Sequence, residues 1–236
     1  MQRVGRVVAL TIEEMRTAVR IGMTTAELDA VAASTFKRHG ARSAPQLAYG
    51  FPGTTCISFN DEIVHGVPGP RRLQPGDVLK IDVTAELAGY VADAATTILL
   101  PPFWPKVRKL KDAAVSALRS ALSVARSGER VSVIGRAIEA EARREGFGVV
   151  RELCGHGVGR RIHEPPQVPN YENRSSNDLL TDGLVIAVEP MLTLTPSHAA
   201  EDADGWTIRT RNGCVAVHEE HTVVIRQGAP LIVTAA

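Results

Sequence analysis

Four acidic side chains and one histidine have the types and surroundings expected of metal ligands: Asp82, Asp93, His156, Glu189 and Glu220. Asp82 and Glu189 each end an apolar run that starts at a glycine, and Asp93 and Glu220 lie by later strand-like segments. Carboxylates with one imidazole suit two divalent ions, and the bound charge would remove the repulsion between the acids. Taken singly, Glu189 and Glu220 could instead be solvent-exposed residues at strand ends.

Asp82 and Asp93 lie on two successive strand-like segments, residues 77–84 and 90–100. A turn centred at Leu87–Ala88 would place the two carboxylates directly opposite each other. Like charges so close must share a proton or bind a cation. The alternative is a register that differs by one residue, which would point the two acids apart and into water.

A glycine-rich segment surrounds His156 at residues 154–160 (CGHGVGR). Glycines on both sides of a histidine permit a close backbone approach around its ring. The segment lacks GxGxxG spacing, so a phosphate-binding loop is the weaker interpretation. His65, His163 and His218 are further candidates, and His218 could support Glu220. Each histidine, taken alone, is more often structural than catalytic.

The elements expected around these residues follow one order twice: two helices, then strands. The predicted helices cover residues 4–22, a segment from a capping box at Thr24 to near Gly40, 105–127 and 131–146. Strands are expected over residues 46–60, in the segments that hold Asp82 and Asp93, and from residue 149 onward. The order predicts one α+β domain over residues 1–236, with halves of about 1–102 and 103–236 and helices on one face of an antiparallel sheet.

Composition excludes several classes of function. The formal net charge is +1, from 27 basic and 26 acidic residues, which argues against a nucleic-acid partner bound through bulk charge. No apolar run approaches the roughly 20 residues of a membrane span, and no signal-peptide pattern begins the chain. Three cysteines without zinc-site spacing suit a reducing compartment, so we expect a cytoplasmic protein without a membrane partner.

Together, these residues resemble the type I methionine aminopeptidases, a family with the pita-bread fold. The resemblance fits from about residue 3 to residue 228, and its motifs are IDVT at 81–84, Asp93, CGHGVGR at 154–160, HEPPQV at 163–168, VEPM at 188–191, DGWT at 204–207 and EHT at 220–222. It implies two pseudo-symmetric halves with helices packed on a curved antiparallel sheet. The implied activity is removal of the initiator methionine from nascent polypeptides when the next residue is small.

The resemblance also implies the roles of individual residues. Two adjacent divalent ions (Co, Mn, Fe or Zn) would be held by Asp82, Asp93, His156, Glu189 and Glu220, with Asp93 and Glu220 bridging them. Glu189 would move the proton of the attacking water, and His65 and His163 would contact substrate and transition state. The implied partners are nascent N-termini, with room for a transient ribosome association, and we expect a monomer.

Phe51, Cys56 and Trp206 are the expected walls of an apolar pocket for the methionine side chain, although ordinary core packing would also explain them. The chain departs from the family pattern at Ala48, where a tyrosine is common, and at Ile162, where an aromatic residue is common. Residues 94–97 (AATT) also differ. These departures do not change the implied metal ligands. They concern how strictly the pocket would select a methionine side chain.

Three rival functions remain, and one is a phosphate- or nucleotide-binding protein that would use the glycine-rich segment around His156. A proline-directed peptidase of the same fold usually carries an additional N-terminal domain, for which this chain has no room. A binding protein that kept the fold without catalysis would typically lack metal ligands, whereas all five are present here.

Overall fold

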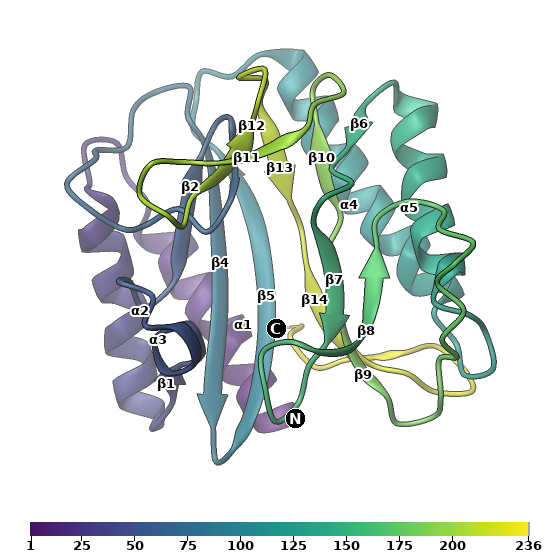
Figure 1. Ribbon diagram of the computed structural model, residues 1–236. Helices are drawn as coiled ribbons and strands as arrows, with labels where there is room; N and C mark the ends of the chain where they lie inside the picture. The colour runs from purple at the N-terminus through teal and green to yellow at the C-terminus, as the bar shows by residue number, and fades with distance from the viewer. Residues whose placement is uncertain (236) are drawn as a thin grey trace.

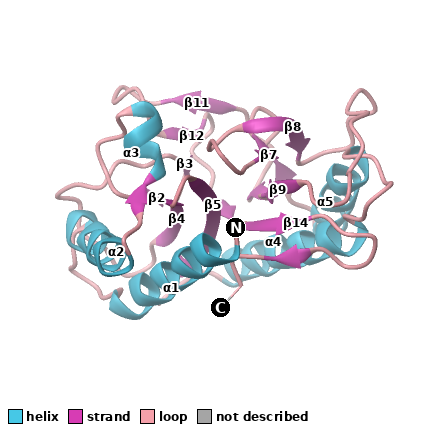
Figure 2. Ribbon diagram, turned by 90° about the horizontal axis from the view of Figure 1, so that it is seen from below, coloured by secondary structure: helices cyan, strands magenta, loops and turns pink. Residues whose placement is uncertain are grey.

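Four helices lie in one row along one side of the strands (Figures 1 and 2). The computed structural model describes residues 1–235, and these helices are α1 (Gln2–Ala18), α2 (Thr25–His39), α4 (Pro105–Val124) and α5 (Ser132–Glu145). The short α3 (Ala44–Tyr49) lies on the opposite side of the strands. The four predicted helices are therefore confirmed, and α3 is an additional one.

Local sequence explains where the helices begin and end. The Thr24 side chain accepts a hydrogen bond from the Glu27 N–H, and the Glu27 carboxylate accepts one from the Thr24 N–H, which confirms the predicted capping box. Gly40 ends α2 in the left-handed conformation, with φ of 67°. In contrast, α1 ends at Ala18 rather than at Gly22, because Val19 already has an extended ψ of 124°.

The strands form four sheets, and every strand pair within residues 1–235 is antiparallel. One sheet contains β1 (Arg42–Ser43), β2 (Cys56–Phe59), β4 (Val78–Leu87) and β5 (Tyr90–Leu99). A five-stranded sheet has the order β15 (Leu231–Ile232), β14 (His221–Val224), β9 (Val185–Val188), β7 (Cys154–Gly157) and β8 (Glu164–Pro169). The two smaller sheets are β13 (Ala216–His218), β10 (Met191–Thr193) and β6 (Gly148–Val149), and β11 (Ala199–Glu201), β12 (Ile208–Thr210) and β3 (Glu62–Val64).

The β4–β5 hairpin corrects the predicted register. Its two loop residues are Ala88 and Gly89, both at positive φ as a tight hairpin turn requires, so the turn is centred one residue later than expected. Asp82 therefore pairs with Ala95, and Asp93 pairs with Thr84. The prediction that the two acids are directly opposed is wrong. The partner of Asp82 is nevertheless two residues away from Asp93 along β5. Residues two apart on a strand point to the same face, so both acids lie on the same face of the sheet.

The segment over residues 46–60 is a second correction, because only its end forms a strand. Ser43 caps α3 by accepting a hydrogen bond from the Gln46 N–H, and Pro45 lies in the first turn, where its missing N–H costs nothing. The strand expected here is limited to β2, which pairs with β4 and places Cys56 opposite Asp82.

Two hydrophobic cores lie beneath the helix layer. One packs α1 and α2 against β4 and β5, and it includes Val8, Leu28, Ile81 and Ala92. The other packs α4 and α5 against the five-stranded sheet, and it includes Leu110, Ile134, Ile186 and Val223. The sheets meet where the Glu220 N–H donates to the Ala95 carbonyl, at 2.9 Å. No helix within residues 1–235 is both long and apolar enough to cross a membrane.

Candidate metal centre and active site

The five predicted ligands come from strands of both large sheets and from the loops at their ends. Ligand atoms of Asp93 on β5, His156 on β7 and Glu220 just before β14 all lie within 4.8 Å of one another. Glu189, directly after β9, adds its Oε1 at 3.5 Å from the His156 Nε2. Asp82 is on β4, on the same face as Asp93. The structure therefore gathers residues that are far apart in the sequence around one point.

Burial makes this cluster electrostatically costly. It raises the pKa of Asp82 and of Glu220 well above the usual carboxyl range, and the charge of Asp93 adds to both shifts. Burial also raises the pKa of Glu189 to about 8, although the nearby His156 opposes this rise. Without a cation, burial and mutual repulsion therefore favour the protonated form of these carboxyls.

The donor atoms of the cluster fit divalent metal ions. Asp82 Oδ1 and Glu220 Oε1 are buried and have no hydrogen-bond partner among residues 1–235. A buried carboxylate oxygen without a partner is expensive, and a bound cation would satisfy it. Four carboxylates and one imidazole form a set that suits Mn, Fe, Co or Zn ions.

Neighbouring side chains hold the ligands in place. The Thr84 hydroxyl donates to Asp93 Oδ1 at 2.8 Å, and the Thr222 hydroxyl accepts from the Asp93 N–H and donates to its carbonyl. His156 Nδ1 lies 2.9 Å from the Gly157 carbonyl, which assigns the proton to Nδ1 and leaves Nε2 directed at the cluster. These contacts orient the ligands before any ion binds.

The glycines beside His156 allow β7 to lie tightly between its neighbours. A Cβ on Gly157 would approach the Pro165 carbonyl oxygen to 2.1 Å, and one on Gly155 would approach the Ala187 carbonyl oxygen to 2.4 Å. Only glycine can be accommodated at these positions without a backbone shift.

His218 is a buried neighbour of two of these acids. Its Nε2 lies 3.4 Å from Glu189 Oε2 and 3.8 Å from Glu220 Oε2, and neither ring nitrogen has a hydrogen-bond partner among residues 1–235. Burial lowers the pKa of His218 to about 4, so the ring is neutral. Alternation in the sequence predicts its place beside Glu220, but its contact with Glu189 depends on the pairing of β13 with β10.

A narrow cavity of about 80 Å³ opens onto the acids. Phe51, Cys56 and Trp206 line it together with Asp82 and Asp93, and the rings of Phe51 and Trp206 meet edge to face at 5.2 Å. The structure thus gathers the three predicted wall residues in one cavity. Burial raises the pKa of the Cys56 thiol well above its usual value, so this wall stays uncharged.

His65 and His163 also line this cavity. Burial lowers the pKa of His65, and it lowers the pKa of His163 to about 4 with a further contribution from His156. Both rings are therefore neutral near pH 7, and each can donate one hydrogen bond. The Tyr49 hydroxyl lies 2.7 Å from His163 Nδ1, which directs the other ring nitrogen away from Tyr49. The sequence gives no role to Tyr49, because only the fold of α3 brings it to His163.

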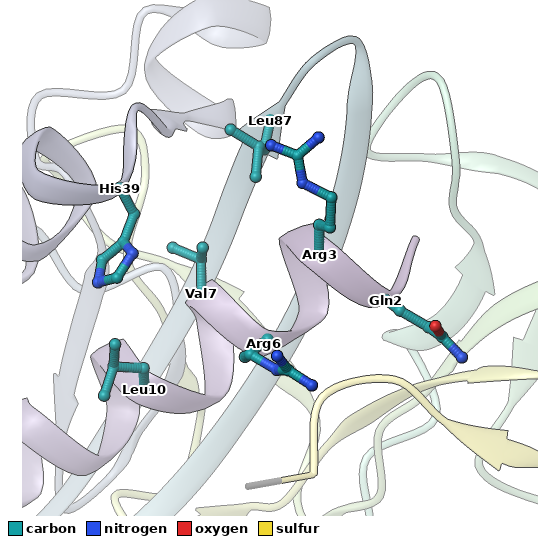
Figure 3. A pocket seen from close by; sticks show the side chains of 7 residues that line it. All are labelled: Gln2, Arg3, Arg6, Val7, Leu10, His39 and Leu87. Atoms are coloured by element: carbon teal, nitrogen blue, oxygen red, sulfur yellow. The ribbon is translucent and has the colours of Figure 1, made fainter.

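A different hollow of about 370 Å³ lies between α1, the end of α2 and the end of β4 (Figure 3). Gln2, Arg3, Arg6 and His39 contribute its polar groups, and no carboxylate of residues 1–235 lines it. It therefore lacks the ligands that a divalent ion requires.

Comparison with known proteins agrees with this geometry. The model of metallopeptidase family M24 matches residues 1–227. The chain belongs to metallopeptidase family M24. As a metallopeptidase, it depends on a metal cofactor, for which the carboxylate cluster is the candidate site.

The relatives of this M24 chain include methionine aminopeptidase 2 of Bacillus subtilis, which is 40% identical over 236 residues that cover 99% of this chain and 95% of the relative. A crystal structure of methionine aminopeptidase from Thermotoga maritima superposes with a TM-score of 0.97 at 31% identity and covers 100% of this chain and 95% of the other. A prolidase from Pyrococcus furiosus has a TM-score of 0.80 at 22% identity, covers 100% of this chain and 62% of the prolidase, and shares the fold alone. The predicted α+β pita-bread fold and the predicted resemblance to methionine aminopeptidases are confirmed.

Proposed function

We propose that this M24 chain is a methionine aminopeptidase that removes the N-terminal methionine of polypeptides whose second residue is small. One observation supports this most directly: the apolar cavity walled by Phe51, Cys56 and Trp206 opens onto the carboxylate cluster. A thioether side chain packs well against aromatic rings and sulfur. The relatives at 36–40% identity carry the same activity in their names.

We further propose that the cluster holds two divalent ions. The ligands would be Asp82, Asp93, His156, Glu189 and Glu220. When bound, the ions would lower the pKa of a water molecule and polarise the scissile carbonyl group. Manganese, iron, cobalt and zinc all suit this donor set, and their availability in the cell would select among them.

Side chains of the protein would carry out the remaining steps. Glu189 would accept the proton of the attacking water and transfer it to the leaving amine, because its carboxylate lies in the cluster beside His156 and the neutral ring of His218. His163 would donate a hydrogen bond to the developing oxyanion, and its low pKa keeps it neutral for this purpose. His65 would hydrogen-bond the amide nitrogen of the scissile bond or a group next to it.

The proposed substrate is the free N-terminus of a nascent polypeptide. Several points stay predictions: that the protein is a monomer, that it works in the cytoplasm and that it contacts the ribosome only transiently. The division of the domain into halves at about residue 102 also stays a prediction.

Release of methionine from the peptide Met-Ala-Ser by metal-loaded protein tests this function. We expect release with at least one of Mn, Fe, Co or Zn, none after chelation, and little hydrolysis of Ala-Pro. Glu189→Gln should lower kcat by about 10²- to 10⁴-fold, because the amide cannot accept the proton. Absence of methionine release with every metal would contradict the proposal, and faster hydrolysis of Ala-Pro would favour a proline-directed peptidase.

A further inference from the structure

A second and wider cavity, of about 590 Å³, adjoins the methionine pocket. The two cavities share Tyr49, Ile162 and His163 as lining residues. We call the wider cavity the exit groove; its other walls include Arg42, Leu47, Glu86, Arg160 and Arg161. Leu47 and Tyr49 belong to α3, which lies on the side of the strands opposite the helix layer (Figure 2).

The position of the exit groove relates it to the substrate. A peptide whose first side chain occupies the pocket can continue past His163 into the groove, because His163 lines both cavities. Leu47 and Tyr49, 54% and 52% exposed, offer an apolar surface there that no other element covers within residues 1–235. An extended chain of several residues fits such an open groove.

The groove carries an excess of positive charge. Arg42 is neutralised by Glu86 at 2.7 Å, and the other oxygen of Glu86 accepts the Gly89 N–H. Arg160 donates to the Gly89 carbonyl and to the Tyr90 hydroxyl, so its charge meets no carboxylate within residues 1–235.

Arg161 is the second arginine of the groove without a carboxylate partner among residues 1–235. Its side chain is exposed and has no hydrogen-bond or ion-pair partner among residues 1–235. The nearby acid, Glu164, uses its Oε1 to accept the backbone N–H groups of Arg160 and Arg161, both at 2.7 Å. Two guanidinium groups without a carboxylate partner among residues 1–235 therefore remain in the groove.

We propose that the exit groove binds the residues of the substrate that follow the scissile bond, and that Arg160 and Arg161 select polypeptides with acidic side chains there. This inference rests on the proposed aminopeptidase function. Arg160 is the better anchored of the two, since its guanidinium also stacks on the Tyr90 ring at 3.8 Å, so little side-chain freedom is lost on binding. Arg161 supplies the adjustable contact.

Three peptides test the inference: Met-Ala-Ser, Met-Ala-Asp-Asp-Asp and Met-Ala-Lys-Lys-Lys, with kcat/KM measured for each on the metal-loaded protein. We expect the acidic peptide to exceed the lysine peptide by about fivefold or more at low salt. The ratio should shrink as ionic strength rises from about 0.01 M to about 0.15 M, because the screening length falls from about 30 Å to about 8 Å.

Arg161→Glu should abolish or reverse the preference for the acidic peptide. The matched control is Arg119→Glu, the same charge reversal at an exposed position of α4 in the helix layer, which should retain the preference. Equal rates for both tails, or a preference that persists in Arg161→Glu, would overturn the inference while methionine release from Met-Ala-Ser stands. If no peptide releases methionine with any metal, the proposed function fails, and this inference fails with it.

Discussion

Glu189 contacts a different histidine with each carboxylate oxygen: Oε1 lies 3.5 Å from His156 and Oε2 lies 3.4 Å from His218. His156 is also a candidate metal ligand, whereas His218 is a buried, neutral ring. These distances place the carboxylate between the cluster and the buried His218 ring. A carboxylate that is both buried and oriented suits the transfer of a proton between two fixed positions.

Trp206→Ala should weaken binding of the methionine side chain. The substitution removes the ring that meets Phe51 edge to face and opens the cavity to water. We expect KM for Met-Ala-Ser to rise about 10- to 100-fold with a smaller change in kcat, as for other losses of apolar pocket contacts. The control is Trp104→Ala, whose side chain is 75% exposed. An unchanged KM for Trp206→Ala would contradict the role of Trp206 in binding the methionine side chain.

Residue types and spacing pointed to four acids and one histidine, because a carboxylate in an apolar strand is costly unless a cation or another partner neutralises it, and the family resemblance implied their role as ligands. They were not sufficient for Tyr49 or for the contact of His218 with Glu189. Tyr49 reaches His163 only through the position of α3, and the His218 contact needs the pairing of β13 with β10. Contacts of this kind depend on the three-dimensional path of the chain.

At the scale of elements, β7 is tightly enclosed by its neighbouring strands. It pairs with β8 on one side and β9 on the other, and its glycines face backbone carbonyls at short distance. Any side chain larger than hydrogen at Gly155 or Gly157 must push one of these strands away. Since His156 lies between the two glycines, such a shift would also displace a candidate ligand.

Gly157→Ala should therefore reduce both stability and metal binding. The new methyl group would lie 2.1 Å from the Pro165 carbonyl oxygen, a backbone atom that cannot rotate away. We expect a loss of about 1–3 kcal/mol in the free energy of unfolding. Thermal unfolding and metal titration by calorimetry measure the two effects. Gly228→Ala is the control, because nothing lies within 4 Å of the place that its methyl group would take; equal behaviour of both variants would contradict the prediction.

Helices were easier to predict than the register of strands. Caps and apolar spacing are local signals, and they located the helices that start at Thr25 and Pro105. The hairpin register depended on whether Gly89 belongs to the turn, and its positive φ places it there. Similarly, Ser43 and Pro45 signal the start of α3, but the apolar and β-branched residues that follow favoured strands over residues 46–60.

At the scale of the whole molecule, two hydrophobic cores flank the cluster, and the ligands come from strands on both sides of it. The Thr222 hydroxyl bonds the backbone of Asp93 across 129 residues of sequence. The repeated order of two helices and strands suggested this arrangement, whereas the contact between β5 and β14 depends on how the two sheets pack.

The metal-free protein should lose stability as pH rises from 6.5 to 8. The pKa of Glu189 is about 8 in the folded chain against an ordinary value of 4.5, so its contribution is complete below 4.5 and is lost as pH rises through 8. Burial shifts the pKa of Asp82 and Glu220 in the same direction. Above pH 7 the pKa of Lys80, lowered to about 7 by burial, gives a smaller opposite contribution.

Thermal unfolding after chelation, measured at several pH values, tests this expectation. We expect the midpoint to fall across this range, and the fall to be smaller in Glu189→Gln, which removes one of the titrating carboxyls. With a divalent ion bound, the trend should reverse, since protons compete with the ion for the same oxygens. A midpoint that rises with pH in the chelated wild-type protein would contradict the assignment of raised pKa values.

The hydrogen bonds between Asp93 and Thr222 join two distant parts of the chain beside the acids. An ion held by Asp93 and Glu220 would tie the same two parts together, in the manner of a removable cross-link that closes a very long loop. By mass action, each tenfold rise in the concentration of free ion above its dissociation constant would add about 1.4 kcal/mol to the free energy of unfolding. The supply of the ion in the cell would then set the lifetime of the folded protein as well as its rate of catalysis.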